Sequence, residues 1–120
     1  MSKKETAILF LKLVGSGQVK EAFNKYIDPN FFHHNQYFKG DSDSLKKAME
    51  EAHQTSPNKS LEVKYCYEDG NTIITHSLVT KADMEIAVVH IFRFKNNKII
   101  EIWDLGQVII ENSPNKNGLF

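Results

Sequence analysis

The chain has 120 residues, of which 41% are hydrophobic and 25% are charged, the size and composition of one globular domain. Fifteen Lys and Arg balance fifteen Asp and Glu, which argues against a nucleic-acid-binding protein, because such proteins normally carry a basic excess. The single Cys66 cannot form an internal disulfide, and the apolar run Ala7–Leu11 is too short for a signal peptide or membrane span. We therefore expect one domain over residues 1–120, cytoplasmic, with no nucleic-acid or membrane partner.

The N-terminal part of the chain is predicted to be helical. Apolar residues recur every three to four positions over Ile8–Val14, the spacing of a buried helix face, and Gly15–Gly17 ends that helix. A second helix is predicted over Gln18–Tyr26. It ends at Asp28–Asn30, because the proline there lacks an amide hydrogen and restricts the residue before it.

An aromatic segment separates these helices from a third one. Phe31–Gly40 holds four aromatic residues and two histidines without a clean period, and we expect it to be extended and packed across another element. Asp41–Ser44 offers N-cap residues for a third helix over Leu45–Thr55, which Ser56–Asn58 ends.

From Ser60 onward the hydrophobic period is two, which is typical of half-buried strands. Asp69–Asn71 and Lys95–Lys98 have the composition of hairpin turns, and Glu111–Phe120 is a polar tail. The pattern predicts four strands, at residues 60–68, 72–80, 85–94 and 98–110.

Helices followed by an antiparallel meander define an α+β domain. We expect three N-terminal helices packed in a strongly curved, mainly antiparallel sheet, with a cavity at one end. The other face of the sheet still carries Val, Ile and Trp side chains. This face predicts a homodimer that forms through the sheet.

Strand parity identifies polar residues that share a face with apolar neighbours. His76 and His90 each lie between apolar residues of the same parity, so we expect both rings to point into the domain. Together with His34, they predict three imidazoles around one pocket, where histidine is suited to proton transfer near neutral pH. In the last strand, Asp104 shares its parity with apolar residues and Trp103 has the opposite parity.

Plainer interpretations of these residues stay open. Any single histidine is better explained as a core residue whose nitrogens are satisfied by hydrogen bonds, whereas for His76 and His90 together neither interpretation is favoured. A zinc site is not predicted, although it would have one possible set of ligands: His34, His76, His90 and Asp104. The only close spacing is His33–His34, and adjacent residues of an extended segment point in opposite directions.

Two further residues have structural interpretations. Cys66 alternates with tyrosines and is expected on the more polar face of its strand, as a structural cysteine. Arg93 is expected to pair with Glu101 across the last hairpin.

Several short patterns carry a resemblance to a known family. They are His34–Asn35 after the aromatic run, Asp69–His76 with its turn and strand histidine, Ile91–Gln107 with Phe-Arg and Trp-Asp, and the ending Asn117–Phe120. In this order they resemble the SnoaL-like polyketide cyclases of the nuclear transport factor 2 superfamily, and the resemblance covers essentially the whole chain.

The resemblance implies a single SnoaL-like domain with a cone-shaped α+β barrel, usually dimeric through the sheet. It also implies a pocket without cofactor or metal that performs acid/base chemistry, such as intramolecular aldol closure. The sequence departs from the family at two positions. His90 stands where the cyclases have an aspartate, and Ile102 stands where they have a histidine before Trp-Asp.

The leading hypothesis is a cofactor-independent acid/base enzyme, an aldol cyclase, dehydratase or isomerase acting next to a carbonyl of a small hydrophobic molecule. Its candidate catalytic residues are His90, His76 and His34. Its candidate substrate-binding residues are Asn35, Tyr37, Phe38, Trp103 and Asp104. The alternative is a non-catalytic ligand-binding or dimeric interaction module, favoured by the loss of the family aspartate at position 90.

Overall fold

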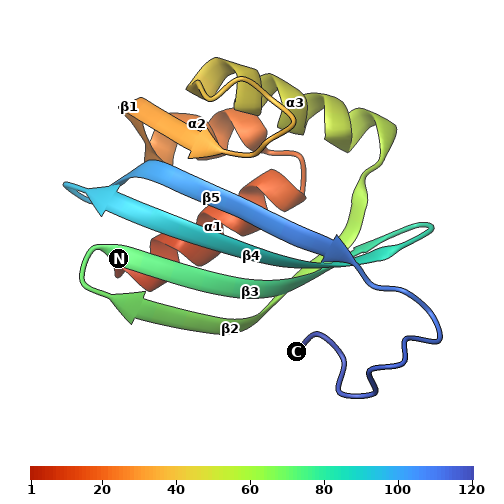
Figure 1. Cartoon of the computed structure of the whole chain (residues 1–120). Coiled ribbons are helices and arrows are strands. Elements are labelled where there is room, and N and C mark those ends of the chain that lie inside the picture. The colour runs from red at the N-terminus through yellow and green to blue at the C-terminus, as the bar shows by residue number, and fades with distance from the viewer.

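The computed structural model describes residues 1–120, and Figure 1 shows three helices on one side of a twisted sheet. The strand order in the sheet is β1-β5-β4-β3-β2. β1 runs parallel to β5 and every other neighbouring pair is antiparallel. The elements are α1 Lys3–Gly15, α2 Val19–Tyr26, β1 Ile27–His34, α3 Ser42–Thr55, β2 Asn58–Asp69, β3 Thr72–Lys81, β4 Glu85–Lys95 and β5 Lys98–Val108.

This arrangement confirms the predicted fold class, three helices packed in a curved, mainly antiparallel sheet. Two of the helices begin at side-chain caps that the sequence supplies. The Ser2 hydroxyl accepts from the Glu5 amide at 3.1 Å, and the Glu5 carboxylate accepts from the Ser2 amide at 3.1 Å. The Asp41 carboxylate accepts from the Ser44 amide at 2.9 Å and starts α3.

The fifth strand, β1, was not among the four predicted strands. It begins at Ile27, directly after α2, and therefore includes Asp28–Asn30, where the second helix is predicted to end. It pairs with β5 through contacts such as His34 with Trp103. Because this partner lies about seventy residues further along the chain, no local hairpin signal marks the pairing.

The hydrophobic core lies between the helices and one face of the sheet, here called the inner face. Phe10 of α1 packs edge-on against Phe92 of β4, with ring centroids 6.2 Å apart. In the register of the sheet, Phe92 lies between Ile73 and Ile102, which are both buried. The opposite, outer face of the sheet is turned toward the viewer in Figure 1 and is not covered by a helix.

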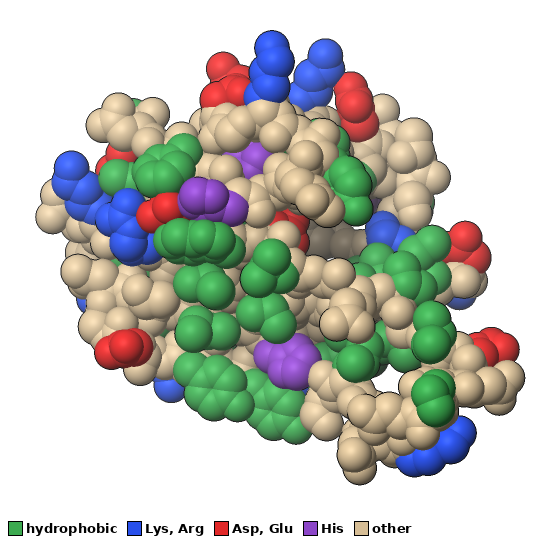
Figure 2. All heavy atoms as spheres, in the orientation of Figure 1, with side chains coloured by type: hydrophobic (Ala, Val, Ile, Leu, Met, Phe, Trp, Pro, Cys, Tyr) green, Lys and Arg blue, Asp and Glu red, His purple; other side chains and the backbone are tan.

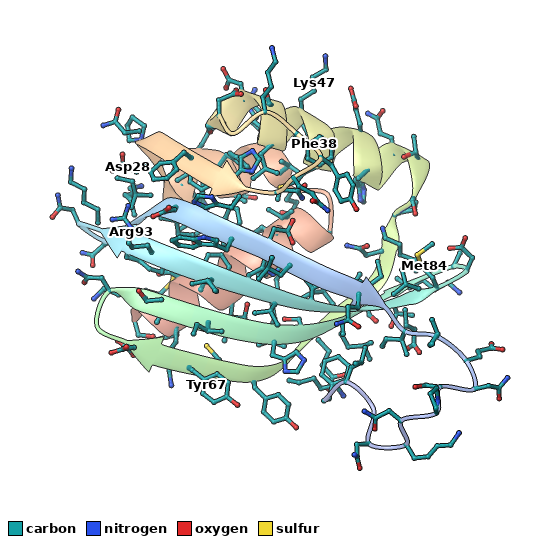
Figure 3. The ribbon with its side chains drawn as sticks, in the orientation of Figure 1. Asp28, Phe38, Lys47, Tyr67, Met84 and Arg93 are labelled. Carbon is teal, nitrogen blue, oxygen red and sulfur yellow. The ribbon has the colours of Figure 1, made fainter.

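A register shift in β2 between Val63 and Tyr65 changes which of its side chains face the core. Val63 and Cys66 pack against the core, whereas Tyr65 and Tyr67 are exposed; Figure 3 labels Tyr67 at the lower edge of the sheet. The prediction that Cys66 lies on the more polar face is therefore wrong, since strict alternation fails at the bulge. Burial raises the pKa of the Cys66 thiol.

The side chains of β3 that face the core are not the ones predicted, because the prediction had His76 pointing into the domain. Its buried residues are Ile73, Thr75, Ser77 and Val79. His76 has the other parity and lies on the outer face. Both parities of this strand contain apolar residues, so the pattern alone does not decide which side the helices cover. None of the helices has the length and apolar composition needed to cross a membrane.

Candidate functional site

The candidate site lies on the inner face, where β4 and β5 place an imidazole beside a carboxylate. His90 and Asp104 are directly paired in the register of the two strands. The His90 Nε2 atom lies 3.3 Å from Asp104 Oδ1. Asn35, which directly follows β1, donates from Nδ2 to Asp104 Oδ2 at 2.8 Å. We call His90, Asp104 and Asn35 the inner site.

The inner site stabilises the ionised form of Asp104. Burial disfavours its charge, but the hydrogen bond and the charge of His90, together with the Asn35 amide, outweigh burial and lower the pKa of Asp104. The side chain of His90 is 11% exposed and that of Asp104 is 26% exposed. Asp104 is thus the member of the pair that a ligand from solvent can reach.

A hollow of about 480 Å³ opens beside Asp104, because β1 stops at His34 while β5 continues to Val108. Figure 2 shows a recess here, between the β1–α3 loop and the sheet, with acidic atoms at its edge. In Figure 3, Phe38 lies on that loop and Met84 on the β3–β4 turn, on either side of it. The hollow is lined by His34, Asn35, Gln36, Tyr37, Ile86, Val88, Asp104, Leu105, Gly106 and Val108.

Polar atoms continue behind Asp104 on the inner face. The Thr75 hydroxyl, the Ser77 hydroxyl and His90 Nδ1 are buried and have no hydrogen-bond partner. Thr75 is the register partner of His90 across β3 and β4. Buried polar atoms are almost always paired in folded proteins, so this patch is unusual for a core that serves stability alone.

A second cluster lies on the outer face, near the start of β5. His34 Nε2 lies 2.7 Å from Glu101 Oε2, and Arg93 Nε donates to Glu101 Oε1 at 2.7 Å. The His34 ring stacks on Trp103 with centroids 4.7 Å apart and planes 11° apart. We call His34, Glu101, Arg93 and Trp103 the outer cluster. The predicted pairing of Arg93 with Glu101 is confirmed.

The outer cluster also holds a carboxylate in its ionised form. Glu101 is buried, which opposes its charge, but hydrogen bonds from His34 and Arg93 and the charges of both outweigh this effect. The pKa of Glu101 is lowered as a result. The His34 and Arg93 side chains on either side are both 43% exposed, and neither Glu101 nor Arg93 lines the hollow beside Asp104.

The structure does not gather the three predicted imidazoles around one pocket. His90 belongs to the inner site, whereas His34 lies in the outer cluster and reaches only the rim of the hollow. His76 lies on the outer face, where its ring stacks on Phe120 at 4.7 Å and lies 5.6 Å from Tyr65. β1 and β3 turn His34 and His76 away from the helices, because the opposite parity of each strand is the buried one.

The other predicted substrate-binding residues are divided in the same way. Asn35, Tyr37 and Asp104 line the hollow, Phe38 lies on the same loop outside the lining, and Trp103 belongs to the outer cluster. Sequence reasoning missed three inner-face residues: His33, Thr75 and Ser77. The signal for the last two is their alternation with apolar residues in β3, where buried Ile73 and Val79 flank them.

Two negative observations restrict what the site can hold. No three His, Cys, Asp or Glu side chains lie close enough together to hold a metal ion. A second hollow of about 460 Å³ is lined only by residues 107–119, and Lys116 is its only ionisable side chain. A hollow of about 500 Å³ has Asp28, Asp41, Asp43 and Lys46 in its lining, and one of about 380 Å³ on the outer face has His76. Among these hollows, the one beside Asp104 contains a carboxylate that lies next to a buried imidazole.

Solved structures of other proteins share this fold. An NTF-2 like protein of unknown function from Burkholderia xenovorans has a TM-score of 0.73 at 16% identity, over 93% of this chain and 88% of its own. A snoaL-like polyketide cyclase from Agrobacterium tumefaciens has a TM-score of 0.73 at 12% identity, over 89% and 92%. A de novo designed protein with a curved β-sheet has a TM-score of 0.71 at 19% identity, over 87% and 86%.

The chain therefore has the NTF2-like, or cystatin-like, fold, and the predicted resemblance to SnoaL-like proteins is confirmed at the level of the fold. No protein-family model and no curated protein matches the sequence. A designed protein has the same fold as a polyketide cyclase, so the fold alone does not define an activity. The function has to follow from the side chains of the site.

Proposed function

We propose that this protein binds a small, uncharged, largely apolar carbonyl compound in the hollow and transfers a proton on it without a cofactor. The observation that carries the proposal is the Asp104 carboxylate, which two donors hold in place at the edge of this hollow. A volume of about 480 Å³ lies within the range of small-molecule sites.

The charge of the lining supports an uncharged ligand. Neither Lys nor Arg lines the hollow, and Asp104 is its only carboxylate. A carboxylate or phosphate on the ligand would therefore meet the charge of Asp104 without a Lys or Arg side chain to pair with, which costs binding free energy. Ile86, Val88 and Val108 provide apolar walls for the rest of the molecule.

The proposed chemical step is enolisation. An Asp104 oxygen takes a proton from the carbon next to the carbonyl, and the electron pair of the broken C–H bond moves into the carbonyl group to form an enolate. In isomerisation, Asp104 returns the proton to another carbon of a conjugated enolate. In dehydration, the proton leaves with the β-hydroxyl as water, and in ring closure it goes to the alkoxide that forms when the enolate carbon attacks a second carbonyl. The Nε2–H of His90 holds the carboxylate during the step, and the Asn35 amide orients it.

Deuterium exchange tests this step without knowledge of the natural substrate. The probe is 2-tetralone, a neutral bicyclic ketone, in deuterated buffer, and NMR follows the loss of its protons next to the carbonyl. We expect the protein to accelerate exchange, and we expect a carboxylated 2-tetralone to exchange at the buffer rate. Equal acceleration of both ketones would contradict an uncharged ligand, and no acceleration of either would contradict the proposed proton transfer.

A non-catalytic binding module is the second candidate, and one observation favours it. His90 Nδ1 and the Thr75 hydroxyl are sealed from solvent, so the imidazole reaches a ligand only through Asp104. This candidate predicts that 2-tetralone binds without accelerated exchange. In that case, Asp104→Asn changes the affinity and no rate.

We also propose that the protein forms a homodimer through the outer face. Exposed apolar side chains on this face support the proposal, among them Tyr65, Tyr67 and Leu105, and Figure 2 shows hydrophobic side chains gathered across it. Light scattering should give twice the monomer mass. Leu105→Glu should yield the monomer, and a wild-type monomer at high concentration would contradict the proposal.

A further inference from the structure

His33 is a buried histidine that none of the steps above uses. It is 5% exposed and lies on β1, with its ring stacked on Phe31 at a centroid distance of 6.3 Å. The sequence predicts its neighbour His34 at the pocket, but the parity of β1 points His33 inward. A buried imidazole needs partners for both ring nitrogens, and the contacts of His33 provide them.

Both nitrogens of the His33 ring bind the backbone of the β1–α3 loop. Nδ1 accepts from the Asn35 amide at 3.1 Å, and Nε2 lies 2.6 Å from the Lys39 carbonyl oxygen. Since a carbonyl oxygen only accepts, Nε2 carries the proton, and the ring is neutral in one tautomer. The His33 backbone amide also donates to the Gly40 carbonyl at 3.1 Å. His33 therefore ties together the two ends of the segment 35–40.

This segment contributes Asn35, Gln36 and Tyr37 to the wall of the hollow, whereas His33 itself is not part of the lining. The Asn35 carbonyl oxygen Oδ1 accepts from the Tyr37 amide at 3.0 Å, which leaves Nδ2 to donate to Asp104 at 2.8 Å. Hydrogen bonds thus lead from His33 through Asn35 to Asp104, and His90 Nε2 lies 3.3 Å from the other oxygen of that carboxylate.

We propose that His33 is a positioning residue of the inner site: its neutral ring clamps the 35–40 loop and so aims the Asn35 amide at Asp104. The expected effect of His33 on turnover rests on the proposed function, whereas its effect on the direction of the Asn35 side chain does not depend on any reaction. His33 touches neither the hollow nor Asp104 directly. Without the clamp, the loop would lose two hydrogen bonds and the Asn35 side chain would lose its fixed direction.

Three substitutions separate the two hydrogen bonds of the ring. His33→Asn keeps an acceptor near the position of Nδ1, so it retains the bond from the Asn35 amide. His33→Gln keeps a donor near the position of Nε2, so it retains the bond to Lys39 only. His33→Phe keeps the stacking on Phe31 and removes both bonds.

The primary readout is the titration of Asp104, followed by carboxyl ¹³C NMR of the full chain, with Glu101 of the outer cluster as internal control. We expect the Asp104 midpoint to rise in His33→Phe and in His33→Gln, because Asn35 no longer holds the ionised form. His33→Asn should restore the wild-type midpoint, and Glu101 should titrate alike in every variant. If His33→Phe does not fold, the difference between the Asp104 midpoints of His33→Gln and His33→Asn is sufficient to test the role of His33.

The result that overturns the inference is an unchanged Asp104 midpoint in folded His33→Phe, or equal midpoints in the Gln and Asn variants. Turnover of 2-tetralone gives a second readout. We expect a loss of roughly 10- to 100-fold in kcat for His33→Gln, with recovery in His33→Asn. If the wild-type protein does not accelerate exchange at all, the proposed function fails, and the Asp104 titration still decides the role of His33.

Discussion

Two histidine–carboxylate pairs lie on opposite faces of β5, three residues apart in the sequence, and they differ in what surrounds them. Glu101 is buried between His34 and Arg93, and each of its oxygens lies 2.7 Å from a nitrogen of one of these side chains. Asp104 binds His90 and Asn35 and borders a hollow of about 480 Å³. A histidine–carboxylate pair can support chemistry only where a cavity lets a ligand reach it, and of these two pairs the one with Asp104 borders such a cavity.

The two pairs also differ in their unpaired atoms. Both carboxylate oxygens of Glu101 have a nitrogen partner close by, from His34 and from Arg93, and these two side chains are partly solvated. On the inner face, three buried polar atoms have no partner within the protein: His90 Nδ1 of the inner site, and Thr75 Oγ1 and Ser77 Oγ of the neighbouring β3. Unpaired buried groups cost stability. The outer cluster therefore has the character of a structural ion pair, whereas the inner site has the character of a functional one.

The largest expected effect separates the two pairs by activity. Asp104→Asn removes the proton acceptor and should reduce the exchange rate of 2-tetralone by roughly 100-fold or more, the scale of general base catalysis. Glu101→Gln is the matched substitution on the outer face and should leave the rate unchanged. A similar loss in both variants, measured by NMR under identical conditions, would show that the comparison is wrong.

A double-mutant cycle separates the pairs by stability. We expect Glu101→Ala to lower the free energy of unfolding by about 1–2 kcal/mol, because Arg93 and His34 lose their shared acceptor. Arg93→Ala should couple to it by about 1 kcal/mol or less, since the guanidinium is partly exposed. Urea unfolding of the four proteins measures the coupling. Strictly additive effects would mean that the ion pair does not stabilise the fold.

The pH dependence of stability tests both carboxylates together. The pKa values of Glu101 and Asp104 are lowered from the ordinary 4.5 and 3.8. A group whose pKa is lower in the folded state stabilises the protein above its unfolded pKa, and this contribution disappears as the pH falls through the folded pKa.

We therefore expect the free energy of unfolding to fall with pH below about 5. Glu101→Gln and Asp104→Asn should each make this fall shallower. Urea unfolding at several pH values between 2 and 7 gives the slopes. A variant with the wild-type slope would show that its carboxyl group is not paired in the folded state.

The smallest expected effect concerns the thiol in β2. Cys66 packs against the core and burial raises its pKa, so it should react with a disulfide reagent roughly tenfold more slowly than an exposed thiol. The matched control is Tyr67→Cys in a Cys66→Ser background, which places a thiol on the outer face. Equal rates at the two positions would contradict the bulge between Val63 and Tyr65.

Much of the fold was predictable from local patterns. The hairpin turns, the capping residues and the change of hydrophobic period from helix to strand all have short-range physical causes, and they gave three helices and four strands. β1 could not be found in this way, because its only partner in the sheet is β5 and the pairing is parallel. Its polar and aromatic residues do not alternate clearly between an apolar and a polar face.

The site was predictable only in part. Asp104, Asn35 and Tyr37 were placed among the candidates and line the hollow. The prediction that His90 points into the domain was right. The same prediction for His76 failed, because Ile73–Val79 and Ile74–Leu78 give two equally apolar parities in β3. In β1, whether His33 or His34 points into the core depends on which side of the sheet the helices cover. A hydrophobic period of two residues does not contain this information, because it depends on the tertiary structure.

The central claim is that the inner site, and not the outer cluster, receives the ligand. The most direct test is ¹⁵N NMR of the histidine rings during titration with 2-tetralone. We expect the His90 signals to move, because Asp104 lies between that ring and the hollow, and the His76 signals to stay in place. A saturable shift confined to His76, with His90 unchanged, would contradict the account.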